Sequence, residues 1–571
     1  MTPTARRATL DRPRRPRRRL GRPRTGTPRP SLHVAGAVLL LLGAGLALSA
    51  GAAGAGDAAS FTPSPGGVVL RNTTVVAATT AVVTTLGAWA AAHARVHHTY
   101  RGRGLAHALC LAPLLLPPPT IALALLALAG RNGLLTRHLG LAPLAYGAPG
   151  LVVAAALSAF PYAYLVLLHG ISRQDPRVFE AAADLGAGRG VLACRELEAL
   201  RPPLAVAALL VVAHTIADLA DPLVLGGGYV VVATRLFEAA TAENDLTEAV
   251  THGVSLTLAC ILVALVVRHI GGRSHPVAAG TPWRRTVARG PGALAVVAVQ
   301  GTVAAAVASA GIVVLLGAVG ALDPGGPTFD ALRAVTTGPF RVALADTVLA
   351  ALLATALALP LGVLVGGRIA TGRAPLAAGV TAAMQAVPPL VYGLVAWVVL
   401  TSTAGPLVHA APPGVAVGEA QTWLLLVAVL TTASFPATAA TVADASRRLP
   451  RAPAQAALTL GADAADVRRD LVLPALRPVL GAELGTTFAR SATALSPVAL
   501  LSTTRTPLLP VDLVTAAENG RVSEACAMAT VLGLLVAVVV MVSSGGRRTE
   551  GPAAGEDAPG VAGLQSRWWG R

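Results

Sequence analysis

The stretch Phe179-Glu-Ala-Ala-Ala-Asp-Leu-Gly-Ala187 occurs a second time in the chain, as Ala454-Gln-Ala-Ala-Leu-Thr-Leu-Gly-Ala462. Each copy is a short alanine-rich segment that ends at a glycine and is followed by an arginine-containing piece that leads to Leu-Arg-Pro. The two glycines are 461 − 186 = 275 positions apart, close to half of the 571 residues. The sequence therefore predicts a tandem repeat with one polar helix-turn-helix in each half.

Local signals predict where the short helix of each copy begins and ends. In the first copy Asp175 can cap the helix, Pro176 suits its first turn, and Gly186 suits the left-handed position that ends it. In the second copy Pro453 opens the helix and Gly461 ends it.

A second helix is expected after each glycine. In the first copy it should run from about Arg189 to Leu200, with a new membrane span beginning at Pro202. In the second copy Asp463 can cap it. The first copy is one residue shorter than the second between its glycine and Arg-Pro.

Both copies are rich in charge, and neither can itself cross a bilayer. Each charged side chain would cost about 2.5–3.5 kcal/mol at the bilayer centre on the insertion scale. A single such loop could be a connector lying on the membrane surface. Two copies in register with a repeat favour docking to another protein, whose groove the small alanine side chains would allow to approach closely.

The composition indicates a polytopic membrane protein. The chain is 54% hydrophobic and 13% charged, with a mean hydropathy of +0.65, and a soluble chain of this length would need more charge at its surface. The formal net charge is +17, but the sequence holds no lysine, so biased composition explains the high isoelectric point and no nucleic-acid partner is predicted. The cysteines are too scattered for a metal site or a disulfide framework: Cys110, Cys194, Cys260 and Cys526.

Runs of about 20 apolar residues predict twelve membrane spans, six in each half. The fold class is therefore all-α, with two tandem six-helix units. The predicted spans are 33–53, 69–93, 104–129, 143–169, 203–224 and 247–268 in the first half, and 292–320, 342–366, 376–401, 421–443, 479–501 and 524–543 in the second.

The span pattern gives five predicted regions. The first is an arginine- and proline-rich tail, disordered by its composition. A first unit, a linker, a second unit and a second disordered tail follow it. Their predicted bounds are 1–32, 33–268, 269–291, 292–543 and 544–571.

Arginine distribution predicts the orientation. With the amino terminus inside, the inner loops 94–103, 269–291 and 367–375 carry several arginines, whereas the outer loops 54–68 and 402–420 carry none. Other outer loops carry some, so the bias is imperfect. It places both termini and both repeated loops in the cytoplasm.

Prolines interrupt two spans at corresponding places and indicate a central pathway. Pro118 lies in a run of three prolines in the third span, and Pro388 is the first of two in the ninth. A proline frees a backbone carbonyl, which in lipid must be satisfied by neighbours or by a cavity. Asp218 and Asp221 lie near the outer end of the fifth span, where they could contact a substrate, ferric ion included, or could cap a helix end.

No catalytic or metal site is predicted. Among His97, His98, His107, His169 and His214, no two have the spacing that zinc prefers on a helix. A phosphate-binding loop needs a lysine, and the chain has none, so ATP and magnesium should be bound by a separate polypeptide. No cofactor is expected on this chain.

At the repeated stretch the chain resembles the permease subunits of ABC importers. Their cytoplasmic signature has an acidic residue, two alanines, Gly-Ala after three further positions, and a later Leu-Pro pair. In this sequence the matching residues are Glu180, Ala181, Ala182, Gly186 and Ala187 in the first copy, and Ala456, Ala457, Gly461, Ala462 and Pro474 in the second. The second copy departs from the signature with Gln455 in place of the acid, and the first has Glu198-Ala199 in place of Leu-Pro.

The resemblance covers about residues 33–545 and implies a function. Fused permease pairs of this kind resemble those for ferric iron, thiamine and 2-aminoethylphosphonate, and stretches 128–135 and 217–238 look most like the ferric-iron members. It implies a multi-pass plasma-membrane protein, with two ATP-binding subunits docked on the repeated loops and an extracytoplasmic solute-binding protein. The other hypotheses are a polyamine substrate, an ion-coupled secondary transporter, and a membrane scaffold without transport activity.

Overall fold

The computed structural model describes residues 65–114, 116–140, 143–271, 283, 285–323, 326–372, 374–410 and 417–543. The two predicted tails, the predicted span 33–53 and most of the predicted linker lie outside these residues. The predicted domain bounds therefore stay predictions.

Nearly every described element is a helix. The first half contains α2 (Pro65–His97), α3 (Arg103–Leu111), η1 (Ala112–Leu114), α4 (Thr120–Ala129), α5 (Leu134–Leu139), α6 (Gly147–Ser172), α7 (Pro176–Asp184), α8 (Arg189–Ala217), α9 (Ala220–Leu225), α10 (Val232–Thr241) and α11 (Leu246–Gly271). The second contains α12 (Pro291–Ala318), α13 (Asp330–Thr336), α14 (Arg341–Ala370), α15 (Pro375–Ala386), α16 (Pro389–Ala410), α17 (Val417–Arg448), α18 (Arg451–Thr459), α19 (Ala464–Val467), the π-helical η2 (Arg468–Val472), α20 (Leu473–Ala492), α21 (Leu509–Glu518) and α22 (Val522–Ser543).

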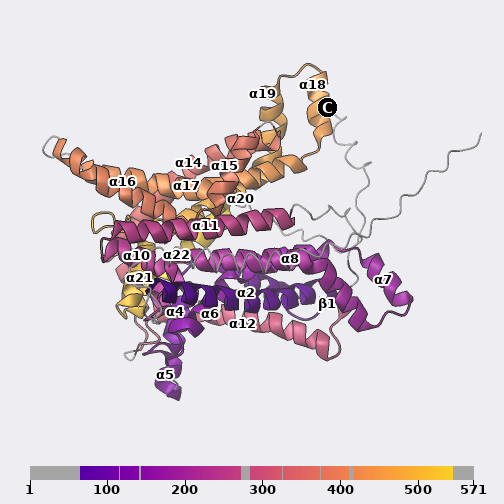
Figure 1. Cartoon of the computed structure of the whole chain (residues 1–571), viewed down its shortest axis with the longest axis horizontal. Coiled ribbons are helices and arrows are strands. Elements are labelled where there is room, and N and C mark those ends of the chain that lie inside the picture. Colours follow the sequence, from indigo (N-terminus) through magenta and orange to yellow (C-terminus); the bar gives the residue numbers. More distant parts are fainter. Residues whose placement is uncertain are drawn as a thin grey trace, which may run out of the picture.

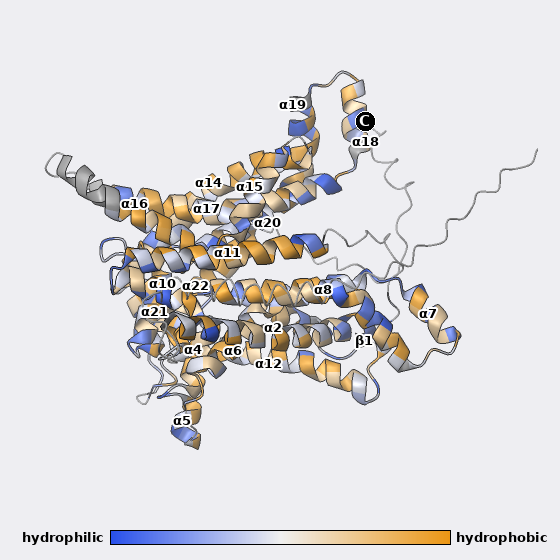
Figure 2. Cartoon of the chain, viewed as in Figure 1, coloured by the Kyte–Doolittle hydropathy of each residue, from blue (hydrophilic) through white to orange (hydrophobic). Residues whose placement is uncertain are grey.

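The predicted all-α membrane fold is confirmed. Eight described helices are long and apolar enough to cross a bilayer, and the bent pair α15–α16 would make a ninth. The eight are α2, α6, α8, α11, α12, α14, α17 and α22. Figure 1 shows long helices running side by side, and Figure 2 shows apolar residues along them.

Three other predicted spans, 104–129, 376–401 and 479–501, do not form a single long apolar helix. The first of these is divided into α3, η1 and α4, and α15 meets α16 at an angle of 92°, so the predicted proline interruptions are both present. At the first break the carbonyl oxygen of Pro117 accepts hydrogen bonds from the backbone N–H and the hydroxyl of Thr120. The predicted span 479–501 corresponds to α20, which ends at Ala492.

The two halves interlock. Helix α12, the first described helix of the second half, packs on α2, α3 and α4 of the first half and on α22. In the opposite sense, α11 of the first half packs on α15 and α16. The largest buried apolar cluster draws on both halves and includes Leu123, Val313, Leu513 and Met528.

The repeat is visible in a matched pair of hydrogen bonds. The hydroxyl oxygen of Thr73 in α2 accepts from the backbone N–H of Val232 at 2.9 Å. In the second half, the hydroxyl oxygen of Thr347 in α14 accepts from the backbone N–H of Leu509 at 2.8 Å. Each bond anchors the start of a short helix, α10 or α21, to the corresponding long helix of its own half, α2 or α14.

Two predicted boundaries are wrong. In the second copy the short helix α18 begins at Arg451, two residues before the predicted Pro453. In the first copy the sequence predicts that a helix ends near Leu200 and that a new span begins at Pro202, but α8 runs unbroken from Arg189 to Ala217 with Pro202 and Pro203 inside it. These prolines deprive the carbonyls of Glu198 and Ala199, four positions earlier, of their helical partners. Both residues are exposed, so water can hydrate the freed carbonyls and the helix continues.

Helices α14 and α17 approach closely at two glycines spaced four residues apart. A Cβ atom at Gly362 would lie 2.6 Å from a methyl carbon of Thr438, and one at Gly366 would lie 2.5 Å from the carbonyl oxygen of Ala439. Small residues at this spacing allow membrane helices to pack backbone to backbone.

We therefore expect Gly366→Leu to destabilise the protein by about 1–3 kcal/mol, the usual cost of overpacking. The measurement is thermal unfolding in detergent, together with size-exclusion chromatography. Gly367→Leu is the matched control, because nothing lies within 4 Å of a Cβ atom built at Gly367. Equal unfolding temperatures for the two variants would contradict the close α14–α17 contact.

Candidate functional site

The two repeated loops fold as short capped helices, which we name elbow 1 (residues 175–188) and elbow 2 (residues 450–463). In elbow 1, α7 begins at Pro176, and a side-chain oxygen of Asp175 accepts a hydrogen bond from the backbone N–H of Arg177 at 3.0 Å. The predicted cap is thus confirmed. It satisfies one of the backbone donors that every helix leaves free at its amino end.

Elbow 1 ends in a left-handed glycine closure. Gly186 has a φ of +86°, a conformation that glycine adopts without a steric penalty. Its N–H donates to the Ala183 carbonyl at 2.9 Å, and the N–H of Ala187 donates to the Ala182 carbonyl at 2.9 Å. This is the Schellman pattern, which satisfies carbonyls at the end of a helix.

Elbow 2 repeats the closure residue for residue. Gly461 has a φ of +92°. Its N–H donates to the Leu458 carbonyl at 3.1 Å, and the N–H of Ala462 donates to the Ala457 carbonyl at 3.0 Å. The predicted helix ends at both glycines are confirmed.

The elbows present exposed side chains. Glu180, Ala181, Gln455 and Ala456 are exposed, while Ala182, Ala187, Ala457 and Ala462 are half-buried. The residue just before each glycine is a leucine that is almost fully exposed: Leu185 at 90% and Leu460 at 88%. The sequence analysis did not single out these two leucines, although a leucine precedes the glycine in both copies of the repeat.

Both elbows project from the same end of the helix bundle. Figure 1 shows α7 at the far right and α18 at the upper right, whereas α10 and α21 lie at the left. Elbow 1 also contacts the segment before the second half, because the Phe179 ring lies 5.2 Å from the ring of Trp283 between centroids. The Trp283 indole N–H in turn donates to the Ile171 carbonyl at 3.2 Å.

The two elbows connect differently to the following helix. Elbow 1 leads directly into α8, whereas elbow 2 leads through α19 and η2 into α20. A π-helical turn accommodates one extra residue within a helix, so η2 accounts for the residue by which the second copy is longer. Pro474 lies in the first turn of α20 and is half-buried.

The two predicted carboxylates lie at the break between α8 and α9, at the far end of α8 from elbow 1. The Asp218 carboxylate accepts from the backbone N–H of Ala220 at 3.1 Å and from that of Asp221 at 3.2 Å. Asp218 therefore does act as a cap. Asp221 is 2% exposed, and within the described part of the chain its Oδ1 atom has no hydrogen-bond partner.

A small cavity adjoins these carboxylates. It has a volume of about 20 Å³ and is lined by both aspartates together with Thr73, Thr215 and Pro222. A space of this size can hold about one water molecule. Neither Pro118, which is exposed, nor Pro388, which is buried, borders it, so the residues predicted for a substrate pathway do not converge on one described cavity.

The carboxylate pair belongs to the first half alone. Past the extra residue of the second copy the offset is 477 − 201 = 276, measured between the two Arg-Pro pairs, so Asp218 corresponds to Ala494 and Asp221 to Pro497. The second half therefore has no carboxylate at either position.

A cluster that the sequence analysis did not anticipate lies near elbow 1. His93, His97 and Glu196 bring one ligand atom each to within 4.8 Å of one another. The histidines considered from the sequence did not include His93, which precedes His97 by four residues on α2.

Comparisons with known proteins agree with this architecture. Residues 83–275 and 342–548 each match the family model described as "Binding-protein-dependent transport system inner membrane component". The chain is 31% identical over 192 residues to a Haemophilus influenzae protein named provisionally as ferric transport system permease protein FbpB 1. It is 30% identical over 184 residues to the ferric transport system permease protein FbpB of Actinobacillus pleuropneumoniae.

These alignments are partial. They cover 32% and 31% of this chain and 30% and 27% of the respective relatives. No solved structure matches the chain. The family model, in contrast, matches once in each half and more than half of the residues in total. The chain is a multi-pass membrane protein and belongs to the family of binding-protein-dependent transport system inner membrane components.

Proposed function

We propose that the chain is the translocation subunit of an ATP-driven importer that receives its solute from a binding protein outside the membrane. Elbows 1 and 2 each dock one copy of an ATP-binding subunit, which holds ATP and magnesium and performs the hydrolysis. The elbow end of the bundle faces the cytoplasm, as do both termini. This chain itself is not an enzyme.

The observation that carries the proposal is the pair of matched elbows. Two short helices with the same closure extend from the same end of the bundle, and each presents a leucine that is almost fully exposed, Leu185 or Leu460. An exposed leucine followed by a glycine at the end of a short alanine-rich helix suits insertion of that helix into a groove of another protein. Duplication in register with the two family matches favours two equivalent docking events.

The connections of the elbows provide a route for mechanical coupling. Elbow 1 is followed by α8, which is continuous to the break at Asp218. Movement of elbow 1 by a closing ATP-binding subunit would be passed along this helix to the opposite end of the bundle. Elbow 2 would act in the same way through α19, η2 and α20.

We further propose ferric iron as the solute. Two relatives are named as ferric transport system permeases, and carboxylates are hard ligands of the kind that a ferric ion prefers. Thiamine, 2-aminoethylphosphonate and polyamines are the alternatives within the same machinery.

An ion-coupled transporter, the alternative of another class, would need a carboxylate free to bind the coupling ion in the membrane. The membrane helices offer two candidates, Asp346 in α14 and Glu483 in α20. Glu483 is not free, since its Oε2 atom lies 3.1 Å from a guanidinium nitrogen of Arg490, which leaves Asp346. Uptake into proteoliposomes that continues without ATP but requires an ion gradient would favour this alternative.

Replacing both elbow leucines should separate docking from folding. Leu185→Asp combined with Leu460→Asp should weaken binding of the ATP-binding subunit by at least about 2 kcal/mol, roughly 30-fold. Since both side chains are exposed, the unfolding temperature should hardly change. The measurements are co-purification with the ATP-binding subunit and ATP-dependent uptake in proteoliposomes.

Leu139→Asp is the matched control, because Leu139 is 64% exposed and lies on α5, away from the elbows. It should leave docking intact. Undiminished co-purification and uptake in the double elbow variant would rule out the docking role of the elbows.

The carboxylates can be tested by removing the buried acid. Asp221→Ser keeps a small polar side chain but removes the charge, and we expect it to lower ferric-iron uptake at least about tenfold, equivalent to 1.4 kcal/mol, with docking of the ATP-binding subunit unchanged. Asp330→Ser, at an exposed acid, serves as the control. Normal iron uptake by Asp221→Ser would contradict a role of Asp221 in transport and would indicate that its role is structural.

A further inference from the structure

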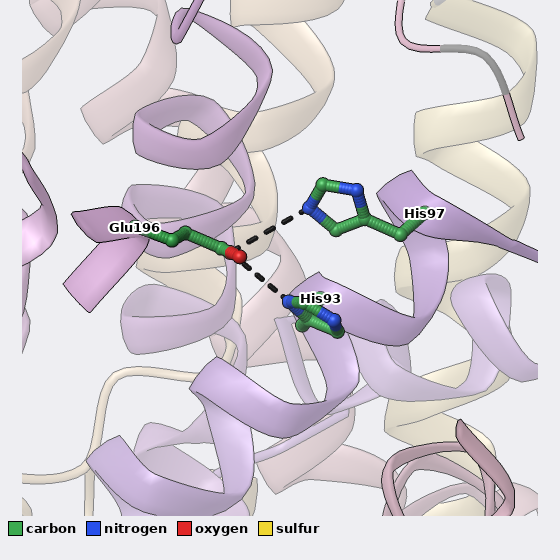
Figure 3. Close-up of side chains that lie close together, drawn as sticks. All are labelled: His93, His97 and Glu196. Carbon is green, nitrogen blue, oxygen red and sulfur yellow. Dashed lines mark hydrogen bonds and ion pairs between the residues drawn. The ribbon is translucent and has the colours of Figure 1, made fainter. Parts of the chain in front are cut away.

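At the elbow end of the bundle, three ligand-forming side chains from two helices point toward one another (Figure 3). Nδ1 of His93 lies 3.0 Å from Oε1 of Glu196, and Nε2 of His97 lies 3.5 Å from the same oxygen. The histidines belong to the last two turns of α2, and Glu196 belongs to the second turn of α8.

The spacing of the histidines places both rings on one face of α2. Residues four apart on a helix are neighbours on its surface, and the ring centroids of His93 and His97 are 4.3 Å apart. Zinc holds nitrogen and oxygen ligands at about 2.0–2.1 Å in a tetrahedral arrangement, which puts two such ligand atoms about 3.3 Å apart. The observed separations of 3.0 Å and 3.5 Å from the Glu196 oxygen lie on either side of this value.

The buried charge of Glu196 also favours binding of a cation. Glu196 is 6% exposed, and among the described residues its ion-pair partners are the two histidines, with no arginine. Nε2 of His97 is buried and forms no hydrogen bond within the described part of the chain. A buried carboxylate is costly unless its charge is compensated. A bound divalent ion would compensate the charge of Glu196 and give Nε2 of His97 a bond that it otherwise lacks.

We propose that His93, His97 and Glu196 form a binding site for a divalent transition-metal ion of the zinc type. Two imidazoles and one carboxylate are an established ligand set for Zn²⁺ and for Fe²⁺, with at least one position left to water. Imidazole nitrogens favour these ions over magnesium and calcium, which prefer oxygen ligands throughout. His93 is 24% exposed and gives the ion a way in.

The site has no counterpart in the second half. The matched threonines, Thr73 and Thr347, set an offset of 347 − 73 = 274 residues between α2 and α14. At this offset the positions of His93 and His97 hold Gly367 and Thr371. A feature confined to one half is not part of the duplicated docking machinery, so the metal site stands independently of the proposed transport function.

Its position indicates what the ion would do. It would join α2 to α8 just after elbow 1. The His97 ring also lies 4.4 Å from the ring of Trp283, edge to face, and Trp283 contacts Phe179 of α7. The bound ion would therefore hold elbow 1, the linker tryptophan and α2 in one arrangement.

The test is metal binding to the full-length protein, purified in detergent with a histidine-free tag, stripped with a chelator and titrated with Zn²⁺ or Co²⁺ alone. The wild type should bind one ion at this site, raise its unfolding temperature on binding, and give the visible absorption of low-coordinate Co²⁺. Glu196→Gln, which can still hydrogen-bond to His93, should lose this binding. Outer-shell changes alone weaken metal affinity roughly 10–100-fold, so loss of a direct ligand should cost at least about 100-fold.

Two further variants keep the result interpretable. His169→Gln removes an exposed histidine outside the cluster and should bind metal as the wild type does. His97→Phe retains a ring against Trp283 while removing the nitrogen, so it separates lost ligation from lost packing. Equal affinity in the wild type, Glu196→Gln and His97→Phe, or no binding by the wild type at micromolar metal, would overturn the proposal and leave a hydrogen-bonded cluster only.

Discussion

Within a bilayer a backbone N–H or carbonyl group cannot form a hydrogen bond to water. This constraint explains where the helices of the chain are interrupted. At the break before α4, the Pro117 carbonyl is satisfied by Thr120. At the break before α9, the Asp218 carboxylate accepts two backbone N–H groups. Where two prolines lie inside α8 the freed carbonyls are at an exposed level, and no break occurs. Interruption is thus permitted where a substitute partner exists, and such places supply the polar groups that function can use.

The two halves share an architecture but not a chemistry. Each has an elbow closed by a left-handed glycine and a threonine that anchors a short helix at the end of the bundle opposite the elbows. The aspartates at the α8–α9 break and the histidine–glutamate cluster occur in the first half, whereas Ala494, Pro497, Gly367 and Thr371 occupy the related positions of the second. Duplication preserved the backbone devices that satisfy hydrogen bonds, because their loss would destabilise either half. Side chains that do not serve this purpose were free to differ.

The repeat, the membrane class and the elbow caps could be predicted because they rest on local rules: apolar length, a capping aspartate and a glycine at the end of a helix. Three features needed the structure. The continuity of α8 through Pro202 depends on exposure of the carbonyls four residues earlier, which a sequence pattern does not give. The metal-type cluster depends on α8 bringing Glu196, 103 residues after His93, against α2. The separation of Pro118 and Pro388 from the aspartate cavity depends on the packing of many helices, and their common role in a pathway stays a prediction.

Helix α8 unites these observations. Its 29 residues span about 44 Å at 1.5 Å per residue, enough to cross the hydrocarbon core with turns to spare at each end. Elbow 1 precedes it, Glu196 lies in its second turn, and Asp218 follows its last residue. Under the proposed function, a displacement imposed at elbow 1 would pass along α8 to the aspartate break. A metal ion that joins Glu196 to α2 would then restrain α8 close to elbow 1, where the ATP-binding subunit is proposed to act.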